Sequence, residues 1–282
     1  MQLQKYTQGL MVFYLCLFGF TSAFAQKLPN KQITSVRAPS TVQIDGKSTE
    51  WGSSLKAYNL ATEIFYTMAN DDKKLYLVVQ SKNLGIMRKI ILGGISLVIQ
   101  KSADRNDNGA AIVKFPYFKE KNRNVVFMLT QSFEDGWHKD PDGRIADSLI
   151  KMSNRNLRTN VKWIYTKGVL GKDSVLSMYN EAGIEAMNAF DKTKTYTSEL
   201  AINLNLLGLS VNNTSKFSYH IMVNDNINKF EPTFTAQRYR GRNSDGTPMS
   251  EAQIDAAKLS VPALNGSGAA LTDFWGEYTL VK

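Results

Sequence analysis

The chain has 282 residues and a formal net charge of +9, and 43% of its residues are hydrophobic. Its one cysteine, Cys16, excludes an internal disulfide, so the fold depends on a hydrophobic core alone or on a core with bound ions. The basic residues are scattered, apart from three arginines within residues 238–242. This distribution favours a solvated surface over contact with an anionic polymer or an outer-membrane surface.

Residues 1–25 are typical of a secretory signal peptide. Lys5 precedes an apolar run over residues 10–20, and residues 23–25 supply the small side chains required before a cleavage site. The run is roughly half the length that a membrane-spanning helix needs, although an N-terminal anchor is the alternative. We therefore expect a secreted or periplasmic protein with no transmembrane helix after cleavage. Nucleic acid is not expected among its partners, whereas association with the cell envelope stays open.

Residues 26–40 are polar and contain two prolines, which predicts a tether or an edge segment. From residue 41 the chain shows short β-like runs separated by turn residues, and we expect one domain over residues 41–282. Pro116 favours an edge position or a bulge for the run that contains it. The expected strands cover residues 75–80, 95–100, 111–118, 125–130, 161–166, 200–204, 217–223 and 275–281.

Apolar and polar residues alternate in several of these runs, which places one face on a core and the other toward solvent or a ligand. The expected fold is therefore an all-β antiparallel sandwich of two sheets, of the jelly-roll or immunoglobulin-like kind. Helical spacing is found at residues 180–190 and 250–259, which predicts one or two short helices in connections. Residues 226–273 are expected to form a long connecting loop before the last strand.

Three stretches of the chain carry motifs with a recognisable order. The first has an Asp-Gly turn followed closely by tryptophan, namely Ile44, Asp45, Gly46 and Trp51. The second has Asp71 and Asp72 before Leu75-Tyr76-Leu77. The third contains Glu199, Ala201, Ile202, Leu204, Leu207, Gly208, Leu209, Asn224 and Asp225. Together they resemble the family 9 carbohydrate-binding modules and their DOMON-like relatives, although Asn203 stands where that family often has proline.

The resemblance implies a β-sandwich that binds sugar chains or another ligand at one end or face. It also implies that structural calcium is a candidate, since the family often carries it. Members of the family often accompany a glycoside hydrolase.

Sugar recognition needs flat aromatic faces with polar groups nearby. Trp51, Trp163 and Trp275 are expected to pack within the fold. Trp137 is the preferred ligand-binding residue because it lies in a polar, turn-rich loop, together with His138 and Asp140. Tyr239, which lies among arginines, is the second aromatic candidate in a loop.

Calcium is the one cofactor candidate. Residues 104–109 place Asp104 and Asp107 in a run of carboxylates and amides that could surround a hard cation, although a hairpin turn also explains the run. Asp142 lies in a second turn of this kind, and Asp225 completes the candidate ligand set. The calcium loop of an EF-hand is excluded because its last ligand position would be Phe115.

Residues for nucleophilic catalysis are lacking, since the chain has no Gly-x-Ser-x-Gly motif and only two histidines. His220 is expected to be a satisfied or exposed strand residue, and a zinc site is not expected. We therefore expect a non-catalytic ligand-binding protein whose ligand is a poly- or oligosaccharide. Two alternatives stay open: a structural or protein-interaction module of the cell envelope, and a hydrolase acting on polysaccharide.

Overall fold

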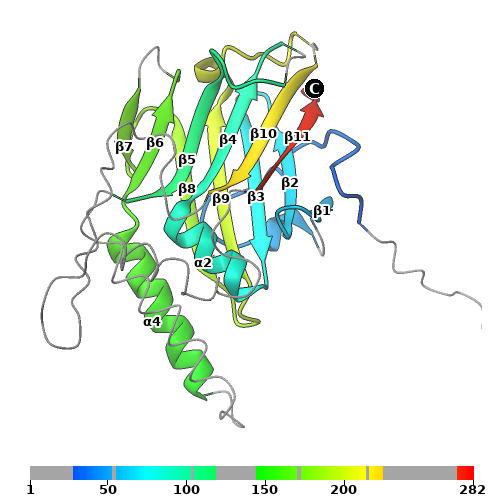
Figure 1. Ribbon diagram of the computed structural model, residues 1–282. Helices are drawn as coiled ribbons and strands as arrows, with labels where there is room; N and C mark the ends of the chain where they lie inside the picture. Colours follow the sequence, from blue (N-terminus) through cyan, green and yellow to red (C-terminus); the bar gives the residue numbers. More distant parts are fainter. Residues whose placement is uncertain are drawn as a thin grey trace, which may run out of the picture.

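The chain folds into two antiparallel β-sheets that face each other, which confirms the predicted all-β sandwich (Figure 1). The computed structural model describes residues 28–52, 55–102, 105–118, 144–169, 173–213, 216–224 and 272–282. The five-stranded sheet has the order β1-β2-β3-β9-β8. The six-stranded sheet has the order β11-β10-β4-β5-β6-β7.

Each strand is short, as expected for a sandwich. The first sheet contains β1 (Ala57–Asn59), β2 (Ile64–Asn70), β3 (Lys74–Ser81), β8 (Ile184–Phe190) and β9 (Tyr196–Asn203). The second contains β4 (Ile95–Gln100), β5 (Ala111–Tyr117), β6 (Trp163–Lys167), β7 (Ser174–Ser177), β10 (Phe217–Val223) and β11 (Thr272–Tyr278). The described helices are η1 (Thr49–Trp51), α2 (Leu84–Gly93), α4 (Arg144–Asn160) and η3 (Leu204–Leu207).

The core lies between the sheets, where alternate residues of facing strands meet. Tyr66 of β2 and Tyr219 of β10 are both fully buried, and their hydroxyl oxygens lie 3.0 Å apart across the sandwich. Burial raises the pKa of both phenols, so they stay neutral and can donate hydrogen bonds. The interior therefore contains a polar link that fixes how one sheet sits on the other.

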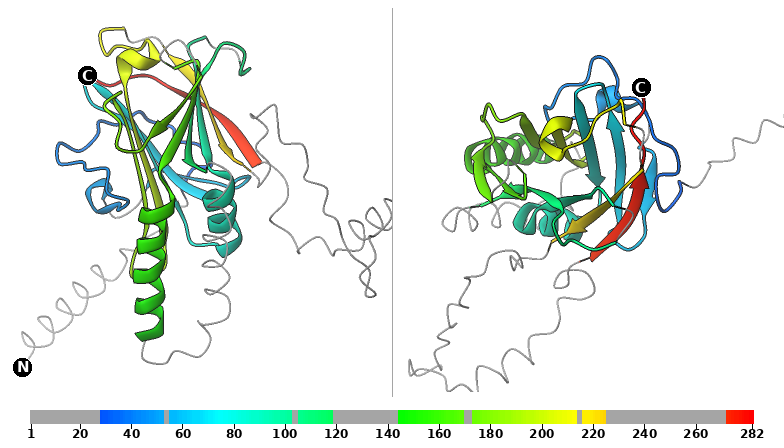
Figure 2. Two further views of the ribbon diagram at one scale, coloured as in Figure 1. Left: turned by 90° about the vertical axis from the view of Figure 1, so that its left-hand side faces the viewer. Right: turned by 90° about the horizontal axis from the view of Figure 1, so that it is seen from above.

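Helix α2 closes one end of the sandwich (Figures 1 and 2). Its start is capped by Asn83, whose side-chain oxygen accepts from the backbone N–H groups of Gly85 and Ile86 at 2.8 and 3.3 Å. The helix contacts β3 of one sheet and β5 and β10 of the other. Ile86 and Ile90 are among the residues that it buries in the core.

Helix α4 packs against β8 and extends beyond the sheets (Figures 1 and 2). The side chain of Asn154 exchanges two hydrogen bonds of 2.8 Å with the backbone of Phe190, which fixes the helix to the end of β8. Lys151, Arg155 and Arg158 are exposed along the helix. No described helix is long and apolar enough to cross a membrane.

The helix predicted over residues 180–190 is wrong. These residues include β8, which pairs with β9 along its whole length. Burial alternates along β8, with Ile184, Ala186 and Phe190 inside and Glu185 exposed, so the side-chain period is two and not 3.6. The helix predicted over 250–259 and the strand predicted over 125–130 lie outside the described residues.

Pro116 lies in an interior strand, since β5 is hydrogen-bonded to β4 on one side and β6 on the other. The register of β5 with β6 shifts between Lys114 and Tyr117, and the Phe115–Pro116 peptide bond is cis. Of the two sequence alternatives, the bulge is therefore confirmed and the edge position is wrong. A bulge tolerates proline because one residue there drops out of the hydrogen-bond ladder.

A buried carboxyl group joins the first sequence motif to the third. Glu199 of β9 is fully buried, and its Oε2 accepts from the backbone N–H groups of Asp45 and Gly46 at 3.0 and 2.8 Å. Its Oε1 accepts from Trp51 Nε1 at 2.9 Å. Burial raises the pKa of Glu199 to about 7, although the three hydrogen bonds act in the opposite direction. The Asp-Gly turn and the tryptophan are thus held by one acid that lies about 150 residues later.

Gly46 has no acceptable substitute in this turn. Its φ of +81° lies in the left-handed region, and a Cβ atom there would lie 2.7 Å from the backbone carbon of Asn188. Trp51 is buried, as the sequence predicted, and its ring contacts Tyr76 with 5.9 Å between centroids.

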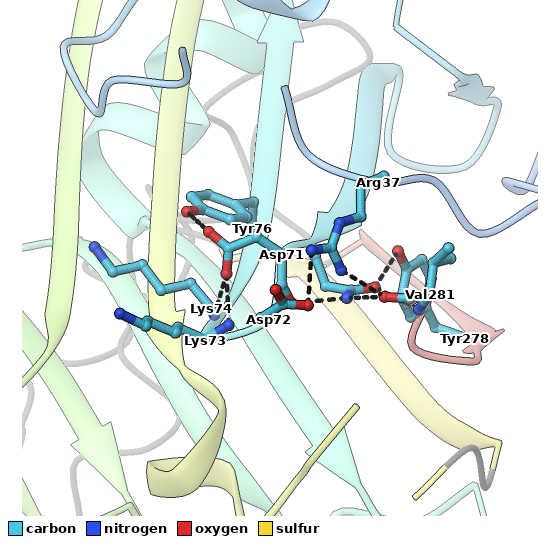
Figure 3. A network of polar contacts seen from close by, with 9 residues as sticks. Arg37, Asp71, Asp72, Lys73, Lys74, Tyr76, Tyr278 and Val281 are labelled. Carbon is cyan, nitrogen blue, oxygen red and sulfur yellow. Dashed lines mark hydrogen bonds and ion pairs between the residues drawn. The ribbon is translucent and has the colours of Figure 1, made fainter. Parts of the chain in front are cut away.

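The turn between β2 and β3 lies where two segments that are distant in the sequence come into contact (Figure 3). The Oδ1 atom of Asp71 accepts from the backbone N–H groups of Lys73 and Lys74, both at 2.7 Å, which shapes the turn. Next to it, Arg37 contacts Asp72 at 2.7 Å and donates to the carbonyl oxygen of Val281 at 3.0 Å. The segment before residue 40 and the last described residues therefore meet at the same hairpin.

Candidate functional site

A groove runs along β11, with a volume of about 340 Å³. One wall consists of residues 275–279 of β11 and its continuation. The facing wall is the N-terminal segment, which contributes Lys31, Gln32, Ile33 and Ser35. Arg105 and Lys216, from the loops before β5 and β10, complete it. We refer to this concavity as the β11 groove.

The N-terminal wall is held firmly by β2 and β11. The side-chain amide of Gln32 forms two hydrogen bonds of 2.8 Å with the backbone of Met68, in the manner of a neighbouring strand. Its backbone N–H donates to the Tyr66 hydroxyl at 2.8 Å. The hydroxyl of Tyr278 donates to the carbonyl oxygen of Val36 at 2.9 Å. Ile33, between these anchors, is 83% exposed and presents an apolar side chain at the groove.

Trp275 is one of two aromatic residues that line the groove, with Tyr278, and it is half-buried whereas Tyr278 is buried. It lies directly opposite His220 in the β10–β11 pairing, and the two rings are stacked with 4.3 Å between centroids and 14° between planes. Nδ1 of His220 lies 3.1 Å from Asp107 Oδ1, and Nε2 lies 3.3 Å from Asp273 Oδ1. Nδ1 is hydrogen-bonded to Asp107, whereas the buried Nε2 has no hydrogen-bond partner among the described residues. The imidazole lies against one face of the indole.

Gly276 allows β11 to lie close to the core beneath the groove. A Cβ atom at this position would lie 2.1 Å from Cζ of Tyr219, so any side chain would collide with the ring. Trp275 and Glu277, which flank Gly276, share the outer face of the strand because side chains alternate along it.

Positive charge dominates the lining of the groove. Lys31, Arg105 and Lys216 line it, whereas Glu277 is the one acidic residue among the described lining residues. The nearest of the three, Lys216, lies 3.0 Å from Glu277, and Arg105 lies 4.0 Å away. The hydrogen bond from Lys216 lowers the pKa of Glu277, so this carboxylate is ionised at neutral pH.

Most of the site residues predicted from the sequence lie outside the described residues. These are Trp137, His138, Asp140, Tyr239, Asp104, Asp142 and Asp225. Asp107 is described, and its carboxylate faces His220. Among the described residues, no group of three or more acidic, histidine or cysteine side chains is arranged to hold a metal ion. Calcium binding therefore stays a prediction.

Sequence reasoning missed the groove because it assigned Trp275 to packing. The sequence of the strand nevertheless contained an indication of its orientation. Asp273, Trp275 and Glu277 alternate with the apolar residues Phe274 and Tyr278, which are buried. A tryptophan that shares the polar face of a strand points away from the core. His220 lies in a strand, as the sequence predicted, but it is buried and only partly satisfied, because Nδ1 is hydrogen-bonded to Asp107 and Nε2 has no hydrogen-bond partner among the described residues.

Neither protein-family models nor curated proteins match this chain.

Proposed function

We propose that the chain is an exported, non-catalytic carbohydrate-binding protein and that a sugar ring lies on Trp275 in the β11 groove. The observation that carries the proposal is the half-buried indole at a groove with polar walls. The C–H groups of a sugar ring favour the face of an aromatic ring, and polar neighbours can bond its hydroxyl groups. The groove volume also lies within the range usual for small-ligand sites.

Preorganisation favours binding at this indole. Because His220 is stacked on Trp275 and is itself hydrogen-bonded to Asp107, the indole loses little rotational freedom when a ligand arrives. A freely rotating surface tryptophan would lose roughly 1 kcal/mol of side-chain entropy in the same step.

The resemblance of the three sequence motifs to family 9 carbohydrate-binding modules supports the same function. Export is supported by the signal-like residues 1–25. Trp137, His138, Asp140 and Tyr239 stay candidates for additional sugar contacts.

The test is affinity electrophoresis and calorimetry against a panel of neutral and charged polysaccharides. Replacing Trp275 by alanine should abolish binding, and replacing it by phenylalanine should retain part of it. Tyr179→Ala is the matched control, because Tyr179 is an aromatic residue that is 69% exposed and follows β7 at the opposite edge of the same sheet. Equal binding by wild type and Trp275→Ala would remove the indole from the site.

A second candidate function is association with the cell envelope. It is favoured by the exposed basic residues Lys151, Arg155 and Arg158 on α4, the helix that extends beyond the sheets. Replacing all three by glutamine should then release the protein from vesicles rich in anionic phospholipid. Unchanged sedimentation with such vesicles would reject this candidate.

A further inference from the structure

We propose that the β11 groove selects acidic glycans, with the carboxylate or sulfate group of the sugar bound by Lys31, Arg105 and Lys216. This inference rests on the proposed function, since it specifies the class of sugar that lies on Trp275. The three cations come from three separate segments of the chain and line one groove. Their convergence gives a site for negative charge that a scattered basic surface would lack.

The charge balance of the groove favours an anion. Among the described lining residues, three basic side chains face one acidic side chain, Glu277, whose carboxylate is already paired with Lys216 at 3.0 Å. Two further described acids nearby, Asp107 and Asp273, lie against the nitrogens of His220. A guanidinium or an ammonium group can only donate hydrogen bonds, so its best partner is a group that can only accept them.

Arg105 is the cation best placed to exchange partners. Its guanidinium lies 4.0 Å from Glu277, beyond hydrogen-bonding distance, and its side chain is 60% exposed. Lys31 forms no ion pair with any other described residue. Both can therefore turn to a ligand without breaking a strong contact. A planar carboxylate or a sulfate group suits a guanidinium, which offers paired donors.

The positions of Trp275 and Glu277 set the geometry of the bound sugar. The two residues point to the same face of β11 and are about 7 Å apart along the strand. A ring lying on the indole consequently brings a substituent to the place where Lys216 and Arg105 meet Glu277. The indole would bind the ring and the cations would bind the acidic substituent.

The test uses the full chain and two matched pairs of polymers; the members of each pair share one sugar backbone, and only one member carries the charged substituent. Polygalacturonate is compared with its methyl ester, and dextran sulfate with dextran, by calorimetry at low and high salt. The groove variant combines Lys31→Gln, Arg105→Gln and Lys216→Gln. The control variant removes the same charge from α4 by combining Lys151→Gln, Arg155→Gln and Arg158→Gln.

We expect the wild type to bind at least one acidic polymer about tenfold or more tightly than its neutral counterpart, because each charge-assisted contact changes affinity by roughly that factor. The groove variant should lose the preference and the α4 variant should keep it. Added salt should weaken only the binding of acidic polymers. Preference for one acidic polymer over the other identifies carboxylate or sulfate as the bound group.

Equal binding of charged and uncharged polymers that Trp275→Ala abolishes would overturn this inference and leave carbohydrate binding intact. Equal loss of the preference in the groove and α4 variants would also overturn it, since general charge would then explain the binding. Failure to bind any polymer of the panel would reject the proposed function itself.

Discussion

Replacing Glu199 by alanine tests how the two distant sequence motifs are joined. The substitution removes the acceptor of three N–H donors, from Asp45, Gly46 and Trp51. Each buried N–H donor left without its acceptor costs roughly 1.5 kcal/mol, so we expect a loss of about 4.5 kcal/mol in the free energy of unfolding. For a domain of this size, that corresponds to a melting temperature about 10 °C lower.

The destabilisation caused by Glu199→Ala should also depend on pH. Burial raises the pKa of Glu199 from 4.5 to about 7, so the folded protein binds this proton more tightly than the unfolded chain does. The associated stability is fully present below pH 4.5 and is lost as pH rises toward 7. The shift corresponds to about 3 kcal/mol. The alanine variant should therefore be most destabilised at pH 4.5 and below, and least destabilised above pH 7.

Urea denaturation followed by tryptophan fluorescence at several pH values measures both effects. Glu185→Ala is the matched control, because Glu185 lies on neighbouring β8 with its side chain 49% exposed. Its loss should stay below about 0.5 kcal/mol at every pH. Equal destabilisation by both variants, or a Glu199→Ala effect that does not change between pH 5 and pH 8, would refute the reasoning.

Two further substitutions test the packing that positions the groove and closes the sandwich. Gly276→Ala should destabilise the protein by roughly 2–3 kcal/mol in urea, because the new methyl group collides with the Tyr219 ring; wild-type stability would show that β11 can move away freely. Asn83→Ala should lower the free energy of unfolding by about 1 kcal/mol, because it removes the cap of α2. Asn83→Asp should retain most of the wild-type stability, because aspartate can also cap a helix. Identical melting of the Ala and Asp variants would show that the cap is unimportant.

The strands with pure β patterning were predictable from the sequence. The strands over 95–100 and 217–223 were predicted with the bounds that the structure has, because their apolar residues face a core and turn residues flank them. Strand β8 was mistaken for a helix because Ile184, Met187 and Phe190 also fit a helical period. Only the pairing with β9, a non-local contact, decides between the two.

Helix α4 was missed for a different reason. Its buried residues, among them Ala146, Ile150 and Leu157, have helical spacing, but polar and basic residues outnumber them. The β11 groove was not predictable because its walls come from residues 31–35, Arg105, Lys216 and 275–279. Local patterns do not record which distant segments meet, so only Trp275 carried a local signal.

The two walls of the β11 groove have a consequence for the order in which the protein folds. The contact between Val36 and Tyr278 joins residues 242 positions apart, and the Arg37–Val281 contact is equally non-local. Closing so large a loop is slow compared with forming hairpins such as β2–β3. The groove must therefore be among the last parts to assemble, and a nascent chain can acquire its ligand only after its final strand has docked.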